Sequence, residues 1–424
     1  MSERIDANVL VTDARAIAAR WREEMDLGEL TSALLSESGL REMTVDLVAI
    51  GKASREMSEA VVDALGTRVR RRITVCDEAS ARRGAMTSDV VVGEHPLPGE
   101  GSLRAGNAVL SFLDDPSDAD ATLFLVSGGA SSLCVLPARP LSLDDLHTVW
   151  EAVLRSGADI TTLNMIRAAS SDLAGGAILR HVHTRRSSSF ILVDNVVSGA
   201  QWVASALTYD FRPSEDQMID LWDAIDLRDV GLRERLLEAG RTRDALMGAP
   251  SPTRHVNLVL GEPAMMLGFA VLEAHHRGYQ VLDMGASVTG DVSDVAAQWR
   301  ATIDAAPDGP VALVGVGEVT VKVSGEGEGG RSQEFAWLMA EVLARSGRHG
   351  AFVAQASDGR DYVEDVAGAW VDGTTLAKTI ARGIDWASVA ESHDTYPALR
   401  SLGQLIDGEH TGWNLCDIYV AVLT

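Results

Sequence analysis

Apolar positions along the chain follow two alternating patterns, one typical of buried strands and the other of amphipathic helices. A mostly apolar run at 45–50 ends in Gly51-Lys52, and apolar residues then recur at helical spacing over 55–65. Strand, glycine turn and helix form a βα unit. Similar runs predict strands at 73–76, 90–92, 122–126 and 190–194, and helices at 103–113, 143–155, 160–179 and 216–224. The alternation predicts a doubly wound, mostly parallel, Rossmann-like sheet that binds ligands at the carboxyl ends of its strands.

A second α/β series follows the charged helical pattern over 227–247 and the linker-like segment Gly248-Ala249-Pro250-Ser251-Pro252. Its strand patterns lie at 256–260, 281–284, 311–315, 352–356 and 418–423, and its helical patterns at 264–276, 292–305, 335–345 and 374–382. We therefore expect two α/β domains, 1–247 and 248–424, with the active site in a cleft between them. We leave open whether the last strand returns to the first domain. Helical periodicity over 8–35 predicts a cap on that first domain.

The composition limits the classes of molecule that the protein could bind and the cellular compartment in which it could work. A formal net charge of -24 disfavours nucleic acids and anionic membranes, because both would be repelled. Cys76, Cys134 and Cys416 lack the spacing of a metal or redox pair, which predicts buried thiols in a reducing compartment. The N-terminus is not signal-like and no apolar run is long enough to span a bilayer. We expect a cytoplasmic protein that acts on a small molecule, and a homodimer is compatible with the sequence.

A glycine-rich loop is the strongest candidate for chemistry. Gly325, Gly327, Gly329 and Gly330 join a strand-like run to a helical pattern, and Arg331 stands at the start of that helix. Backbone N–H groups of such a loop can bind phosphate, and a guanidinium can hold it with two hydrogen bonds. The loop also satisfies G-x-G-x-x-G, a weak dinucleotide signature. Its glutamates, Glu326 and Glu328, would repel a pyrophosphate unless a cation lay between them, and a simple strand-to-helix loop without a ligand explains the glycines equally well.

A second glycine turn follows the strand at 122–126. Ser127, Gly128, Gly129 and Ser131 offer hydroxyls and N–H groups to an anion, although a plain tight turn remains the alternative. The turn is not a nucleophile elbow, because G-x-S-x-G is absent.

Single side chains follow other strands. Lys52 could reach a phosphate or carboxylate, but the Walker pattern around it fails, and a solvated lysine is the alternative. His95 follows the strand at 90–92 and is either a site residue or an ordinary loop histidine. No histidine shows H-E-x-x-H spacing.

Carboxylates are placed where they could hold Mg²⁺, which uses one or two protein ligands beside phosphate oxygens. Asp358 and Asp361 flank Gly359 after the strand at 352–356, and Asp194 ends the strand at 190–194. Solvated aspartates in turns are the alternative.

Taken in order, the motifs cover nearly the whole chain. They comprise Gly51-Lys52-Ala53, Glu94-His95-Pro96-Leu97-Pro98, Ser127-Gly128-Gly129-Ala130-Ser131, Leu163-Asn164 with Arg167, Gly317-Glu318 with Thr320-Val321, Gly329-Gly330-Arg331-Ser332-Gln333-Glu334, Asp358-Gly359 with Asp361, and Thr411-Gly412 with Asn414 and Asp417. Their order resembles the glycerate 2-kinase family, the two-domain type with a MOFRL domain.

The resemblance implies an enzyme that binds ATP and Mg²⁺ and phosphorylates the 2-hydroxyl of a small hydroxy acid. In such an enzyme Lys52, Arg331 and Asp194 would be catalytic. The two glycine-rich loops would bind the nucleotide, and His95, Asn164 and Arg167 would bind the substrate. The metal would lie on carboxylates, for which Asp194, Asp358 and Glu318 are the candidates.

Departures from the family are concentrated in a few places. Ala168-Ala169 stand where the family has a Lys-His pair, and Ser205-Ala206-Leu207-Thr208 stand where it has Ser-Gly-Pro-Thr. The loss of basic groups predicts a divergent member with an altered acceptor. Two other functions stay open: an NAD(P)-dependent reductase of hydroxypyruvate or other 2-keto acids, which the G-x-G-x-x-G match permits, and a catalytically silent nucleotide-binding protein.

Overall fold

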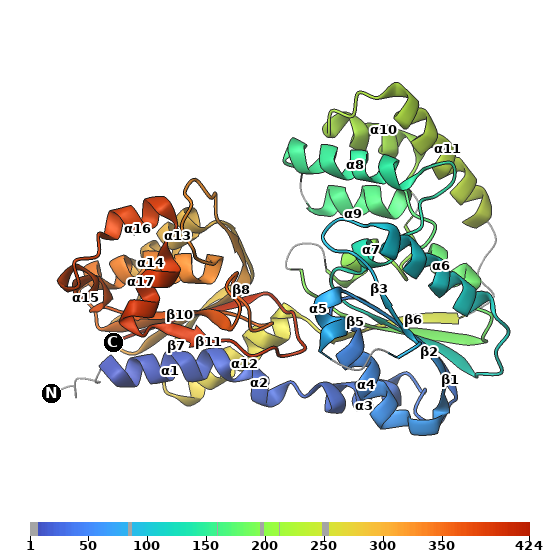
Figure 1. The fold of residues 1–424 in the computed structure, drawn as a ribbon. Coiled ribbons are helices and arrows are strands. Elements are labelled where there is room, and N and C mark those ends of the chain that lie inside the picture. Colours follow the sequence, from blue (N-terminus) through green and yellow to red (C-terminus); the bar gives the residue numbers. More distant parts are fainter. Residues whose placement is uncertain (1–6, 84–86, 159, 196–198, 212, 248–253) are drawn as a thin grey trace. The chain divides into compact units, whose positions relative to one another are not determined.

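The computed structural model describes residues 7–83, 87–158, 160–195, 199–211, 213–247 and 254–424. The chain divides into two units (Figure 1). The central unit is Leu27–Gly261, and the terminal unit is Glu262–Thr424 together with the N-terminal segment that ends at Asp26. This division differs from the predicted limits 1–247 and 248–424, because the first two helices and the strand after the linker each belong to the other unit.

The central unit contains a six-stranded parallel sheet in the order β3-β2-β1-β4-β5-β6. Its strands are β1 (Val45–Ile50), β2 (Val69–Cys76), β3 (Val90–Val92), β4 (Ala121–Val126), β5 (Arg186–Leu192) and β6 (Arg254–Gly261). The order reverses between β1 and β4, which makes that pair the topological switch point of a doubly wound sheet.

Helices cover both faces of this sheet, which explains why every residue of β1 and β4 is buried. One face packs against α4 (Ser54–Leu65), which in turn contacts α3 (Leu27–Glu37). The other face packs against α6 (Glu100–Asp114), α7 (Ala130–Leu133) and η2 (Ala177–His181). Short α5 (Glu78–Arg82) follows β2.

A separate helical core lies beside the sheet within the central unit. It is built from α8 (Leu143–Ser156), α9 (Ile160–Ala169), α10 (Glu215–Ala224) and α11 (Val230–Met247), with η3 (Ala200–Ser205) close to α9. Trp150 and Trp222 fill its centre and are fully buried. This core holds α9, which carries two of the predicted substrate-binding residues.

The terminal unit contains a six-stranded sheet in the order β11-β10-β9-β12-β8-β7. Its strands are β7 (Gln280–Asp291), β8 (Val311–Thr320), β9 (Gly350–Ala356), β10 (Val366–Asp372), β11 (Leu405–Asp407) and β12 (Asp417–Leu423). β7 and β8 run parallel, and the other neighbouring pairs run antiparallel. β12 lies between β8 and β9, so the last strand does not return to the central sheet.

Helices also cover both faces of the second sheet. On one face α1 (Ala7–Ala19) lies against β9 and β12, and α12 (Pro263–His276) lies against β7 and β8, with short α2 (Trp21–Glu24) next to α12. The other face carries α13 (Val292–Ala305), α14 (Arg331–Arg345), α15 (Thr375–Ala381), α16 (Trp386–Ser392) and α17 (Thr395–Leu402). Edge-to-face contacts among Trp299, Phe335, Phe352 and Tyr419 fill the space beneath them.

The predicted α/β architecture with two domains is confirmed, and three details of the prediction are wrong. The strand predicted at 256–260 is β6, which pairs with β5 and so completes the first sheet instead of opening the second. The cap predicted from 8–35 covers the first domain only through α3, which contacts α4, because α1 packs on the second sheet. The long helix predicted over 160–179 ends at Ala169. Within the described residues, no helix is both long enough and apolar enough to cross a membrane, and all three cysteines are buried, as predicted.

Candidate active site

Two predicted site turns meet at the switch point of the central sheet. Gly51 and Lys52 follow β1, and the turn that begins at Ser127 follows β4. The Lys52 N–H donates to the carbonyl oxygen of Gly128 at 2.9 Å, and the Ala53 N–H donates to Ser127 Oγ at 3.1 Å. Since β1 and β4 are adjacent parallel strands, their carboxyl ends bring these turns together, which is where ligands of doubly wound sheets bind.

Glycine allows the backbone of these turns to approach other groups closely. A Cβ on Gly51, which has a φ of +133°, would lie 2.2 Å from Ser127 Oγ. A Cβ on Gly128 would lie 1.6 Å from Oδ2 of Asp194. The Asp194 carboxylate therefore lies directly against the Gly128 backbone, and a side chain at either glycine would displace its neighbour.

Lys52 and His95 lie beside the next glycine of the turn. A Cβ on Gly129 would lie 3.2 Å from Lys52 Cγ and 3.2 Å from His95 Cδ2. Loss of hydration, followed by the charge of Lys52, lowers the pKa of His95 to about 4. Within the described residues, the ammonium of Lys52 forms no ion pair. At neutral pH the site thus combines an unpaired cation with an uncharged imidazole.

Ser131 and Asn164 are joined through Ser205, for which no role was predicted from the sequence. Ser205 Oγ lies 2.7 Å from Ser131 Oγ and donates to Asn164 Oδ1 at 3.2 Å. Ser205 has a φ of +54° and its neighbours Ala204 and Ala206 are also left-handed, a conformation that is costly for residues with a Cβ. This strained segment holds the serine between the predicted nucleotide turn and α9.

Arg167, like Lys52, forms no ion pair within the described residues. Its guanidinium carbon lies 4.2 Å from the centre of the Trp150 ring, and burial lowers its pKa to about 10. Nε of Arg167 has no hydrogen-bond partner among the described residues. The Arg167 side chain lines a cavity of about 10 Å³ together with Ser131 and Ser205. This volume is roughly the space that one water molecule needs. A buried guanidinium without a carboxylate partner favours an anionic ligand.

The glycine-rich loop of the terminal unit is packed against its own fold. It spans the residues between β8, which ends at Thr320, and α14, which begins at Arg331. A Cβ on Gly325 or Gly327 would lie 2.4 or 2.5 Å from the carbonyl oxygen of Ser392. The Gly327 N–H donates to that same oxygen at 2.9 Å. These glycines are therefore explained by close packing of the loop on α16.

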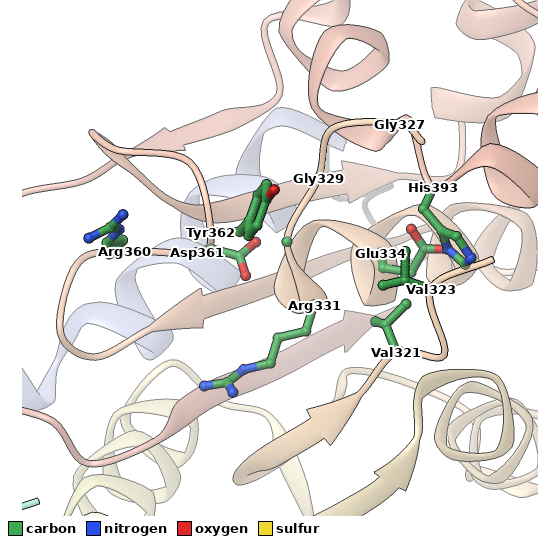
Figure 2. Close-up of a pocket in the computed structure, with 11 residues that line it drawn as sticks. Val321, Val323, Gly327, Gly329, Arg331, Glu334, Arg360, Asp361, Tyr362 and His393 are labelled. Carbon is green, nitrogen blue, oxygen red and sulfur yellow. The ribbon is translucent and has the colours of Figure 1, made fainter. Parts of the chain in front are cut away.

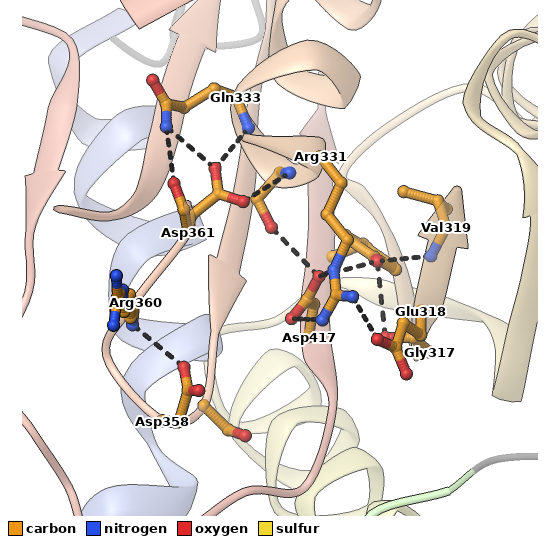
Figure 3. Close-up of polar contacts among 12 residues, drawn as sticks. Gly317, Glu318, Val319, Arg331, Gln333, Asp358, Arg360, Asp361 and Asp417 are labelled. Atoms are coloured by element: carbon orange, nitrogen blue, oxygen red, sulfur yellow. Dashed lines mark hydrogen bonds and ion pairs between the residues drawn. The ribbon is translucent and has the colours of Figure 1, made fainter. Parts of the chain in front are cut away.

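Arg331 is held by two carboxylates (Figure 3). Its Nε donates to Asp417 Oδ2 at 2.7 Å and its Nη2 to Asp417 Oδ1 at 3.1 Å, while Nη1 pairs with Glu318. Burial works to lower the pKa of Arg331, but the charge of Asp417 and the hydrogen bonds to it raise that pKa above its ordinary value. The predicted phosphate-binding guanidinium and the predicted metal ligand Glu318 are thus partners of each other.

Asp361 occupies the start of α14. Its carboxylate accepts from the Ser332 N–H at 3.1 Å and the Gln333 N–H at 2.9 Å, and a Cβ on Gly330 would lie 2.2 Å from Asp361 Cγ. The N-terminus of α14, which follows the loop predicted to bind phosphate, is therefore capped from within the chain. Asp358 accepts from the Arg360 N–H at 2.9 Å inside its own turn.

The ionisation of Asp361 yields a prediction about stability. Burial, and then the charge of Asp417, raise the pKa of Asp361 to about 6 from 3.8. Because the folded state binds the proton more tightly, this carboxyl stabilises the fold fully below about pH 4, and the contribution is lost as the pH rises to about 6. The loss amounts to about 3 kcal/mol.

We therefore expect the free energy of unfolding of wild type, relative to that of Asp361→Asn, to fall between about pH 4 and about pH 6. Above that interval the difference between the two proteins should no longer change with pH. Chemical denaturation of both proteins at pH 4, 5, 6 and 7 measures it. A difference that does not change with pH would contradict the prediction.

A cavity of about 390 Å³ opens beside this cap (Figure 2). Its lining includes Val321, Val323, Arg331, Glu334, Arg360, Asp361, Tyr362 and His393. Glu334 and Asp417 stand in the motifs named above, but no role was predicted for them, and His393 was missed. Their partners lie far away in the chain, so no local spacing indicates these contacts.

The carboxylates predicted to bind a metal ion differ in how well their surroundings suit that role. In the described ranges, no three His, Cys, Asp or Glu side chains gather as a metal cluster. Mg²⁺ bound to phosphates needs only one or two carboxylates, and Asp194 meets that condition beside the glycine turn. Glu318 is engaged by Arg331, which makes it a weaker candidate.

Comparisons with known proteins agree with this two-unit architecture. Residues 5–237 match the domain of unknown function DUF4147, and residues 311–417 match the MOFRL family. The chain is 28% identical over 389 residues to D-glycerate 2-kinase of Thermotoga maritima, covering 89% of this chain and 90% of that protein. It is 29% identical over 392 residues to a putative hydroxypyruvate reductase of Agrobacterium vitis, covering 88% and 97% of the two chains.

The fold of this chain is also similar to that of a solved structure. The crystal structure of glycerate kinase from Thermotoga maritima matches with a TM-score of 0.85 at 25% identity, over 98% of this chain and 100% of that one. Since the DUF4147 match alone spans more than half of the chain, and the MOFRL match follows it in the expected order, the chain belongs to the glycerate 2-kinase family that combines these two domains.

Proposed function

We propose that this protein transfers the γ-phosphoryl group of ATP to a hydroxyl of a small organic molecule. The observation that carries the proposal is the meeting of Lys52, His95 and Asp194 around the glycine turn at the switch point of the central sheet. The similarity to glycerate kinases over most of the chain supports the same reaction class.

The turn after β4 supplies the phosphate-binding part. The N–H groups of Gly128 and Gly129 donate no hydrogen bond within the described residues, so they are available to phosphate oxygens. Ser127 and Ser131 flank them. The ammonium of Lys52 lies beside the same turn and would stabilise the negative charge on the phosphoryl group in the transition state.

Asp194 is the residue best suited to hold Mg²⁺, because its carboxylate lies against Gly128, where phosphate oxygens would bind. The bound ion would neutralise charge on the nucleotide phosphates. The parts proposed for Asp358, Glu318, Arg331 and the loop Gly325, Gly327, Gly329 and Gly330 have less support, because each of them already contacts partners in the terminal unit.

The acceptor is proposed to bind between His95, Asn164 and Arg167. An uncharged His95 can form a hydrogen bond with the reacting hydroxyl. Asn164 accepts a hydrogen bond from Ser205, which in turn contacts Ser131. Arg167 would hold an anionic group. Ala168 and Ala169, both buried, occupy the positions at which the family has a basic pair. The two cations of that pair are therefore absent from this region of the protein.

We therefore expect D-glycerate to be a poor acceptor and a larger or less anionic alcohol to be preferred. Each lost cation typically costs about 2–4 kcal/mol of transition-state binding, a factor of roughly 30 to 10³ in kcat/KM. A coupled assay of ADP release across hydroxy acids, polyols and amino alcohols measures it. D-Glycerate as the best acceptor, with kcat/KM above about 10⁴ M⁻¹s⁻¹, would refute the altered specificity and leave the kinase activity standing.

A reductase is the second candidate, because one relative carries the name hydroxypyruvate reductase. The structure of the loop gives it little support. A dinucleotide fingerprint places its first glycine at the end of a strand, whereas β8 ends at Thr320 and Gly325 packs on Ser392. A fall in NADH absorbance with hydroxypyruvate, and no ADP release with any alcohol, would favour the reductase. Nucleotide binding with neither activity would favour a silent homologue.

A further inference from the structure

Three side chains from separate elements of the terminal unit form a hydrogen-bonded row. His393 Nδ1 lies 3.3 Å from Glu334 Oε1, and His393 Nε2 lies 3.2 Å from Ser324 Oγ. Glu334 stands in the first turn of α14, His393 follows α16, and Ser324 lies in the loop after β8. Figure 2 shows the imidazole of His393 and the carboxylate of Glu334 facing each other at the cavity wall.

Exposure increases along the row in the direction that nucleophilic catalysis requires. The side chain of Glu334 is 6% exposed and that of His393 is 17% exposed, while Ser324 is an exposed residue. An ionised carboxylate only accepts hydrogen bonds, so Glu334 selects the tautomer with a proton on Nδ1. Nε2 then carries a lone pair that faces the serine hydroxyl, as in a Ser-His-acid triad.

The loop that carries Ser324 is fastened to the segment that carries His393. The Gly327 N–H donates to the carbonyl oxygen of Ser392 at 2.9 Å, and the Glu328 N–H donates to Asp394 Oδ1 at 3.0 Å. His393 itself has a φ of +59°, an uncommon conformation that this packing maintains. The pair is therefore positioned by several contacts besides its own hydrogen bond.

Groups that could stabilise an oxyanion and bind a substrate lie next to the row. The N–H groups of Gly325 and Glu326, directly after the serine, donate no hydrogen bond within the described residues. The cavity of about 390 Å³ has His393 and Glu334 in its wall. Val321, Val323 and Tyr362 add apolar surface to it, and Tyr362 is 73% exposed. This lining suits a neutral ester with a short apolar chain.

We propose that Ser324, His393 and Glu334 form a second reactive centre that transfers acyl groups from such esters to water. The Ser324 oxygen bonds to the ester carbonyl carbon while its proton moves to His393 Nε2, and the bond to the alkoxide breaks as that alkoxide takes the proton. Water then attacks the acyl-serine, gives its proton to His393, and the carboxylic acid leaves as Ser324 recovers its hydrogen. Glu334 holds the imidazole and stabilises its charged form throughout. This activity is independent of phosphoryl transfer.

A fluorophosphonate probe, which reacts with activated serines, tests the nucleophile. We expect about one label per chain, located at Ser324 by peptide mass mapping, and no label in Ser324→Ala. Ser392→Ala is the matched control, because Ser392 neighbours His393 but its Oγ donates to the Ser388 carbonyl oxygen at 2.7 Å. That variant should be labelled as fast as wild type.

Hydrolysis of p-nitrophenyl butyrate tests the base and the orienting residue. Ser324→Ala, His393→Asn and Glu334→Gln should each lower kcat/KM by a factor on the order of 10² or more. Asparagine tolerates positive φ and glutamine keeps the buried volume, so these variants retain the local fold, which circular dichroism checks. Labelling of serines other than Ser324, or hydrolysis by Ser324→Ala at the wild-type rate, would overturn the proposal and reduce the row to a contact that holds the loop.

Discussion

Alanine in place of Lys52 is expected to lower kcat for ADP release by a factor on the order of 10² or more, since one charged stabiliser of the transferred phosphoryl group is lost. The Lys52 side chain lies beside Gly129, and its ammonium has no ion-pair partner within the described residues, so its removal leaves no buried charge uncompensated. The thermal midpoint should therefore barely change. Initial rates at saturating acceptor and nucleotide, with melting curves of the same preparations, measure both effects.

Lys378→Ala serves as the control for this experiment. It removes the same ammonium from α15, where Nζ of the exposed Lys378 lies 3.3 Å from Oδ2 of Asp372 at the end of β10. Asp372 is buried but keeps its hydrogen bonds from the N–H and Oγ1 of Thr374 in this variant. Its kcat should equal that of wild type. If Lys52→Ala turned over as fast as Lys378→Ala on the best acceptor, the role assigned to Lys52 would be wrong, whatever the acceptor is.

Arg331→Ala is expected to destabilise the terminal unit by about 3–5 kcal/mol. Asp417, whose side chain is 1% exposed, would be left buried without its bidentate partner, and Glu318 would lose its ion pair. Denaturation followed by tryptophan fluorescence measures the loss. Hydrogen exchange of α14 and β12, read by mass spectrometry, locates it in the unit that contains them.

Arg345→Ala is the matched control, because this exposed arginine in the same helix pairs with Glu341 four residues before it and should cost less than about 1 kcal/mol. The comparison also separates two roles of Arg331. An Arg331→Ala protein that is as stable as the control but has lost kcat would show the guanidinium acting on the phosphoryl group, as the family resemblance implies. A stability loss of the expected size would show that Arg331 mainly positions β12 and α14.

Periodicity and turn chemistry were sufficient for the elements of the central sheet and for one half of the candidate site. The run at 45–50 has no polar face, so it had to be a strand buried on both sides, and β1 has those bounds. Lys52 and the turn from Ser127 to Gly129 then followed from one rule, because parallel strands deliver their carboxyl ends to the same edge. Such inferences are local along the chain, and local patterns are what a sequence displays.

Pairings between distant segments were decided only by the tertiary structure. An apolar strand pattern indicates that 256–260 is a strand but does not state to which sheet it belongs, and the structure places it in β6, at the edge of the first sheet. An amphipathic helix needs only an apolar surface, and α1 found it on the second sheet. Arg331 lies 86 residues from Asp417, and Asp361 lies 28 residues from the amide of Gln333 that it caps. The sequence thus determined which segments form strands and helices and which groups are candidates for chemistry, while packing decided which of those groups already have a partner within the chain and which remain available to a ligand.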